Sequence, residues 1–187
     1  ETVGEVYHQS KSDLRQQYLA YLREYTNDIF SQVYRNGSYQ QVLIHEEGDD
    51  DSHEYEIELL RDDGTREDPS NASGGERAVV NLALRAGIYR LMAELAGGDR
   101  GRLPPLILDE PTTFLDEGHV GQLDEMLHTI RGWDVPQIIV VSHDERLIDG
   151  ADHECRVRID EETNASRVEI RTADDVDETG ARGVGDD

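Results

Sequence analysis

The sequence has little lysine, a single cysteine and no long apolar run, and each shortage excludes a class of protein. Lys11 is the only lysine, and Cys155 is the only cysteine, so no disulfide can form within the chain. A reducing environment is therefore expected. No apolar run approaches the ~20 residues that cross a bilayer, and no secretory signal peptide is recognisable. We expect a cytoplasmic protein with no membrane partner.

The chain also lacks the phosphate-binding loop, Gly-x-x-x-x-Gly-Lys-Ser/Thr, on which many nucleotide-binding proteins depend. It begins at Glu1 rather than at methionine, which favours a segment of a longer protein. If the chain takes part in nucleotide binding, a second segment is expected to hold most of the phosphates.

Basic residues are scarce, with 18 Lys and Arg against 42 Asp and Glu, so the formal net charge is −24 in 187 residues. The acids are spread along the chain, which predicts a protein adapted to molar salt, where repulsion between like charges is screened. This charge opposes contact with DNA, so a DNA-binding surface must be a local arginine patch or lie outside this chain. The length suits one domain with a sizeable core.

Hydrophobic periodicity predicts an α/β fold with a mainly parallel sheet covered by helices. Apolar residues at spacings of three and four predict helices, and short continuous apolar runs predict strands covered on both faces. Helices are expected over 10–34, 75–95, 117–130 and 145–147, and strands over 39–45, 54–60, 106–108, 137–141, 154–159 and 167–171. The strand–helix–strand order after residue 105 implies parallel pairing through a right-handed crossover.

Three regions are expected along the chain. Residues 1–34 form an entering helix, which is either an ordinary core-facing helix or the base of a coiled coil. Residues 35–172 form the folded lobe and end in a β-hairpin. Residues 173–187 are acidic and nearly free of large apolar side chains, so a disordered tail is predicted.

The run Ser73-Gly74-Gly75-Glu76 precedes the second long helix and suits the binding of a phosphate. Ser73 and Glu76 have the spacing of a capping box, which alone is a structural feature. The two glycines between them leave backbone amides bare at the positive end of the helix. We therefore predict a nucleotide contact at these four residues.

Two carboxylates, Asp109 and Glu110, follow the apolar strand that begins at Leu106. Ligands of open α/β sheets collect at the carboxyl ends of the strands. A carboxylate there can hold Mg²⁺, and its neighbour can orient or deprotonate a water for attack on a γ-phosphate. The alternative is an acidic loop that caps the next helix.

His143 follows the strand over 137–141 and is predicted to reach the same sheet edge as Glu110, where a neutral imidazole can bind a γ-phosphate or orient the water. Asp116 and Glu117 either cap the next helix or touch a partner subunit, and their spacing does not decide between these. The histidines show no paired metal-ligand spacing, so a zinc site is not expected.

Together these motifs resemble the carboxyl-terminal lobe of an ABC-type ATPase head, and within that class the Rad50 family of SMC-like DNA double-strand-break repair ATPases. The run Ser73–Glu76 matches the family's signature motif, and Leu106–Glu110 matches its Walker B motif. Leu115–Glu117 matches the D-loop, and Ser142–Glu145 matches the switch-histidine region. The chain departs from the family at Ala72, where leucine usually stands before the signature serine.

The resemblance implies ATP and Mg²⁺ as cofactors and a role for each residue. Asp109 would support Mg²⁺, Glu110 would be the general base, and His143 would sense the γ-phosphate. Ser73 and Gly75 would contact ATP held by the opposite subunit.

The resemblance also implies contacts between copies. Asp116 would work across the dimer interface. Arg77 and Arg85 match family arginines in the helix that links nucleotide state to movement of the lobe.

The resemblance further implies four partners: the N-terminal lobe of the same protein, a second copy joined through ATP, a Mre-eleven-type nuclease, and double-stranded DNA. ATP hydrolysis would release the two heads and so control the nuclease. A nucleoid-associated place in the cytoplasm follows, and the acidic composition points to a halophilic archaeon. Zinc is implied only in the family's hook region, outside this chain.

Three other functions stay open. A transporter-type ATP-binding subunit is the first, although a long helix directly before the hairpin favours the coiled-coil class. An SMC-type chromosome-organising ATPase is the second, but those proteins usually read Asp-Glu-Val-Asp-Ala where this chain has Asp-Glu-Pro-Thr-Thr. The third is a structural lobe that only dimerises around a nucleotide bound elsewhere.

Overall fold

The computed structural model describes residues 3–35, 37–47, 54–97, 103–133, 135–160 and 163–172. The chain forms two compact units, Glu1–Val141 and Ser142–Asp187. The predicted tail over 173–187 lies outside the described residues. Within them, no helix is long and apolar enough to cross a membrane.

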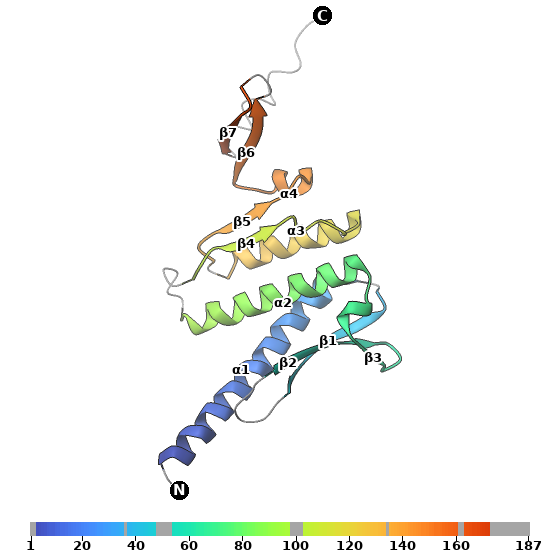
Figure 1. Ribbon diagram of the computed structural model, residues 1–187, viewed down its shortest axis with the longest axis vertical. Coiled ribbons are helices and arrows are strands. Elements are labelled where there is room, and N and C mark those ends of the chain that lie inside the picture. Colours follow the sequence, from blue (N-terminus) through green and yellow to red (C-terminus); the bar gives the residue numbers. More distant parts are fainter. Residues whose placement is uncertain are drawn as a thin grey trace, which may run out of the picture. The chain divides into compact units, whose positions relative to one another are not determined.

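Helix α1 (Val3–Val33) crosses helix α2 (Gly74–Leu95), and the contact between them forms much of the core of the first unit (Figure 1). Helix α1 begins at Val3, seven residues earlier than predicted. Residues 5–10 contain no glycine or proline, so nothing in this stretch stops the helix. Its second half supplies the buried Ile29, Phe30 and Val33. Its first turns are exposed, so this end of the helix has no packing partner among the described residues.

An antiparallel sheet lies against α1 and consists of β1 (Tyr39–Glu47), β2 (Glu54–Arg61) and β3 (Arg66–Glu67). The Asn27 side chain of α1 fixes this sheet by donating to the carbonyl of Val42 and accepting from its amide, both at 2.8 Å. The β1–β2 hairpin confirms the prediction. Strand β3 and the short helix η1 (Pro69–Asn71) are not predicted, because elements of two and three residues are too short to show a hydrophobic period.

The predicted parallel pair is confirmed by β4 (Leu106–Asp109) and β5 (Ile138–Val141), which are joined through α3 (Glu117–Arg131). Leu106 and Leu108 are buried on one face of this sheet, as their alternation in a strand requires. The opposite face is open: its apolar residues Ile107, Ile139 and Val141 are 55%, 37% and 50% exposed.

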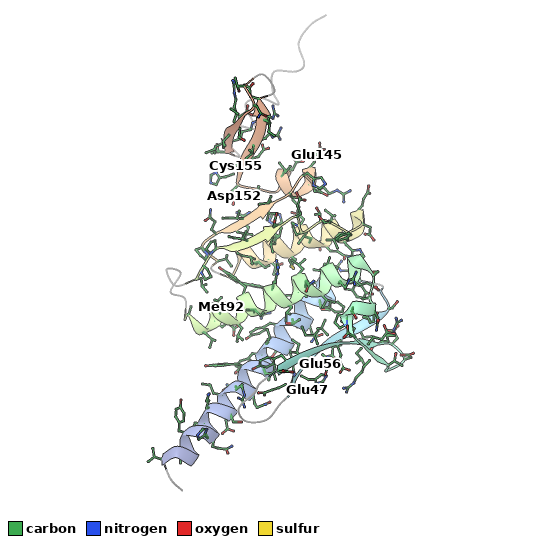
Figure 2. The ribbon with its side chains drawn as sticks, in the orientation of Figure 1. Glu47, Glu56, Met92, Glu145, Asp152 and Cys155 are labelled. Atoms are coloured by element: carbon green, nitrogen blue, oxygen red, sulfur yellow. The ribbon has the colours of Figure 1, made fainter. Side chains whose placement is uncertain are left out.

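The second unit contains the short helix α4 (Glu145–Asp149) and a hairpin of β6 (His153–Asp160) and β7 (Ala165–Thr172). The hairpin confirms the predicted pairing, with Val157 opposite Val168 and Cys155 opposite Ile170. These four side chains share one face of the hairpin and are exposed, and Figure 2 labels Cys155 on β6. This unit therefore presents an uncovered apolar strip.

Candidate functional site

The start of α2 has the predicted cap. Ser73 Oγ accepts from the Glu76 amide at 3.3 Å, and Glu76 Oε2 accepts from the Ser73 amide at 2.8 Å, which completes a capping box. The first intrahelical bond runs from the Arg77 amide to the Ser73 carbonyl at 3.0 Å. The amides of Gly74 and Gly75 precede this bond, so they remain outside the hydrogen bonding of the helix, as predicted for an anion-binding helix start.

The two glycines also make room for Phe114. A Cβ on Gly75 would lie 2.8 Å from the Phe114 carbonyl oxygen, and a Cβ on Gly74 would lie 3.5 Å from the Phe114 ring. Neither glycine has a positive φ, so the close approach of Phe114, not backbone conformation, requires glycine at position 75. This turn therefore contacts the loop that follows β4.

Glu76 joins this turn to the end of α1. Its Oε1 accepts a hydrogen bond of 2.7 Å from the Tyr34 hydroxyl. Burial tends to raise the pKa of Glu76, but the hydrogen bonds from Tyr34 and Ser73 outweigh it and the pKa is lowered. Burial, followed by the bond to Glu76, raises the pKa of Tyr34 to about 12. Glu76 is therefore a carboxylate and Tyr34 a phenol at neutral pH.

Tyr34 is the residue that sequence reasoning missed. It falls at the end of the helix predicted over 10–34, and the helix pattern assigns it no role. No local signal connects Tyr34 with Glu76, 42 residues away, because the contact depends on how α1 and α2 cross.

The predicted carboxylates stand where the parallel pair ends. Asp109 is the last residue of β4 and lies opposite Val141 of β5. The Glu110 amide donates to the Val141 carbonyl at 2.8 Å, which anchors the start of the following loop. Glu110 has φ 45° and Phe114 has φ 77°, a left-handed backbone that is strained for side chains of this size. Such strain persists only where surrounding contacts hold it.

A cavity of about 470 Å³ brings α2 and the end of β4 together. Its α2 wall carries Gly74, Arg77, Asn81 and Arg85, which succeed one another along one side of the helix. Its other wall carries the loop after β4, with Asp109, Glu110, Pro111, Thr113 and Phe114. The structure thus unites the predicted amide turn, arginines and acid pair around one cavity.

Asp116 caps α3, which is one of its two predicted roles. Its Oδ1 accepts from the His119 amide at 3.0 Å and lies 2.9 Å from His119 Nδ1. The bond from the His119 amide is the main reason why the pKa of Asp116 is lowered. The side chain is nevertheless 72% exposed, so its predicted contact with a second copy stays a prediction.

His143 belongs to the second unit, so its place beside Glu110 stays a prediction. Nearby, the Ser142 hydroxyl accepts from the Asp144 amide at 3.1 Å, and Asp144 caps α4. Among the described residues, no group of three or more His, Cys, Asp or Glu side chains could hold a metal ion. A Mg²⁺ at Asp109 would therefore need oxygen donors from water, nucleotide or another segment.

Comparison with known proteins gives relatives for most of the chain, although no family model matches it. Over 163 residues the chain is 46% identical to the DNA double-strand break repair Rad50 ATPase of Halobacterium salinarum, which covers 87% of this chain and 18% of that protein. A solved SMC head bound to the C-winged helix domain of ScpA superposes with a TM-score of 0.71 at 19% identity, covering 90% of this chain and 48% of that one. A structure from work on ATP-driven dimerization and DNA-stimulated activation of SMC ATPases gives 0.64 at 17% identity, covering 89% and 93%.

The fold is that of an SMC-type ATPase head, in its carboxyl-terminal lobe. Within that class, the sequence matches a part of the DNA double-strand break repair Rad50 ATPases. The chain spans less than a fifth of the length of the curated relatives that it matches.

Proposed function

We propose that this chain is the carboxyl-terminal half of an ATPase head that acts in the repair of DNA double-strand breaks. ATP joins two heads, and its hydrolysis releases them. The observation that carries this proposal is the joint presence of a capped glycine turn on α2 and an acid pair at the end of β4, in a chain 46% identical over 163 residues to the Rad50 ATPase of Halobacterium salinarum. The same similarity favours a repair ATPase over a transporter subunit.

The residues present fit ATP and Mg²⁺. Ser73 offers a hydroxyl, and Gly74 and Gly75 offer amides outside the helix hydrogen bonding, which suits a phosphate of the ATP held by the opposite head. Asp109 offers an exposed carboxylate of the kind that Mg²⁺ prefers. Bound Mg²⁺ neutralises phosphate charge. Glu110 then orients and deprotonates the attacking water, and His143 hydrogen-bonds the γ-phosphate.

The N-terminal half of the same protein completes the site. The face of the β4–β5 sheet that carries Ile107, Ile139 and Val141 is apolar and exposed. Parallel strands are normally covered on both faces, so a further layer belongs there. The phosphate loop, absent from this chain, would arrive with that layer.

We also propose two macromolecular partners for the head. The similarity to Rad50 ATPases suggests double-stranded DNA and a Mre-eleven-type nuclease, in a nucleoid-associated complex. The head dimer would control the nuclease. The chain's own charge of −24 opposes DNA, so we place the DNA-binding surface mainly on the N-terminal half. We expect zinc only in the family's hook region, outside this chain.

The test compares the protein with and without its N-terminal half. We expect this chain alone to hydrolyse no ATP, while the full-length protein does. In the full-length protein, Glu110→Gln should retain ATP-driven association but lose hydrolysis by roughly a hundredfold or more. Turnover by the isolated chain, or unchanged turnover by the Gln variant, would contradict the proposal.

A further inference from the structure

We propose that Tyr34 is a positioning residue for the predicted phosphate-binding turn, holding Ser73 in place through Glu76. This inference rests on the proposed function, because it concerns how the end of α1 prepares that turn for ATP. Tyr34 itself is 8% exposed, and its hydroxyl donates a hydrogen bond to Glu76. We infer that its effect on Ser73 passes through that carboxylate.

The contacts on Tyr34 fix its hydroxyl in one place. The ring stacks on Phe30 with centroids 4.8 Å apart, and the hydroxyl accepts from the Ser38 amide at 2.9 Å while donating to Glu76. Gly37 is necessary for this position, since a Cβ there would lie 1.8 Å from the Tyr34 ring. A hydroxyl held on three sides supplies a fixed donor to a charged acceptor, which makes a strong hydrogen bond.

Glu76 connects Tyr34 to Ser73 through its two carboxylate oxygens. Its Oε1 takes the Tyr34 bond and its Oε2 takes the Ser73 amide, so both carboxylate oxygens have a donor. The bond from the Glu76 amide to Ser73 Oγ is long, at 3.3 Å, and cannot by itself orient the hydroxyl firmly. The orientation of Ser73 therefore depends on the carboxylate, and the carboxylate depends on Tyr34.

A second contact of Tyr34 leads to the start of α3. Its ring stacks against the imidazole of His119, with centroids 6.3 Å apart and planes inclined by 26°. His119 in turn contacts the Asp116 carboxylate. Tyr34 is therefore connected, through Glu76 and through His119, to both segments that are predicted to face a second copy, at Ser73 and at Asp116.

The experiment removes one oxygen atom, with Tyr34→Phe in the full-length protein. Tyr25→Phe is the matched control, since the Tyr25 hydroxyl also joins α1 to α2, donating to Glu94 near the other end of α2. Tyr25 is equally buried, and its pKa is likewise raised to about 12, chiefly by the bond to Glu94. We expect both variants to lose similar thermal stability.

Only Tyr34→Phe should alter the turn. Hydrogen exchange without ATP should speed up at the amides of Glu76 and Arg77 in Tyr34→Phe and stay at the wild-type rate in Tyr25→Phe. In a Glu110→Gln background, ATP-driven association should weaken roughly fivefold to tenfold in Tyr34→Phe alone, the loss expected for one hydrogen bond to a charged group. Equal behaviour of the two variants in exchange overturns the proposal.

A double substitution shows whether the effect passes through Glu76. If it does, Tyr34→Phe adds nothing to exchange at Arg77 once Glu76→Ala is present, whereas additive effects overturn the proposed route. Because exchange is measured without ATP, it decides the role of Tyr34 even if the wild-type protein shows no ATP-driven association. That absence would instead contradict the proposed function.

Discussion

Helices α2 and α3 both begin beside the candidate site, and groups of different charge cap their first turns. The cap of α2 is the neutral hydroxyl of Ser73, while the cap of α3 is the carboxylate of Asp116. A hydroxyl leaves the positive end of a helix available to an anion and can itself donate to it, whereas a carboxylate already supplies the negative charge. Two helix starts with the same backbone chemistry are therefore suited to different partners.

The largest expected effect comes from making the caps alike with Ser73→Asp. Aspartate caps a helix as well as serine does, so the melting temperature should change little. The new charge should repel phosphate and weaken ATP-driven association of the full-length protein by about a hundredfold. Sedimentation with and without ATP measures this.

The reverse exchange, Asp116→Ser, serves as the control for that variant. It keeps a capping oxygen on α3 and adds no charge near a phosphate, so any loss of association reports only the contact with a second copy predicted for Asp116 and should stay well below a hundredfold. If Ser73→Asp associates normally, the start of α2 does not face a phosphate.

The next effect separates the two glycines of the α2 turn. In Gly75→Ala the new methyl lies 2.8 Å from the Phe114 carbonyl oxygen, so the loop must shift, at a cost of about 1–3 kcal/mol. In Gly74→Ala it meets the Phe114 ring at 3.5 Å, an ordinary contact, so stability should stay within about 0.5 kcal/mol of wild type. Urea unfolding compares them, and equal costs would mean that Phe114 does not set the glycine requirement.

A smaller effect appears in the pH dependence of stability. Hydrogen bonds lower the pKa of Glu76 and of Asp116 below their ordinary values of 4.5 and 3.8. Their contributions are thus fully present above pH 4.5 and are lost as the pH falls through the lowered values. The difference in urea midpoint between wild type and Glu76→Gln should therefore be largest at neutral pH and shrink toward pH 2. A difference independent of pH would show that the charge of Glu76 is not involved.

The smallest effect, of opposite sign, is expected away from the site. Glu56 on β2 lies beside Glu47 on β1 (Figure 2), and the hydrogen bond that the two carboxyl groups can share only when one is protonated raises the pKa of Glu56. A raised carboxyl pKa means that stability is highest at low pH and falls as the pH rises through it. At pH 7 and low salt, Glu56→Gln should raise the melting temperature slightly, and molar salt should remove the difference. A gain that persists in molar salt would point to packing instead.

The sequence predicts an element or a cap correctly wherever a local pattern of residues determines it. The capping box follows from a Ser-x-x-Glu spacing, and the parallel β4–β5 pair follows from two apolar runs with an amphipathic helix between them. The sequence assigns the glycine turn and the acid pair to two different nucleotides, so the cavity that Gly74 shares with Asp109 and Glu110 is a finding of the structure. Each predicted feature follows from the pattern of one element or of elements that follow one another in the chain.

The remaining features depend on contacts between distant segments. The left-handed backbone of Phe114 and its approach to Gly75 bring together residues 39 positions apart, and no residue type there signals it. The bond from Tyr34 to Glu76 likewise follows from the crossing of α1 and α2. Sequence periodicity reports which face of an element is buried, but not which neighbour covers it.

The open face of the β4–β5 sheet has a practical consequence for producing this protein. Among the described residues, β4 and β5 form a sheet of two strands, so each has an outer edge with no neighbouring strand, in addition to the exposed side chains on the open face. Such edges template the pairing of strands from different molecules. Expression together with the N-terminal half should therefore increase the yield of dispersed material, even where that half carries no working nucleotide site.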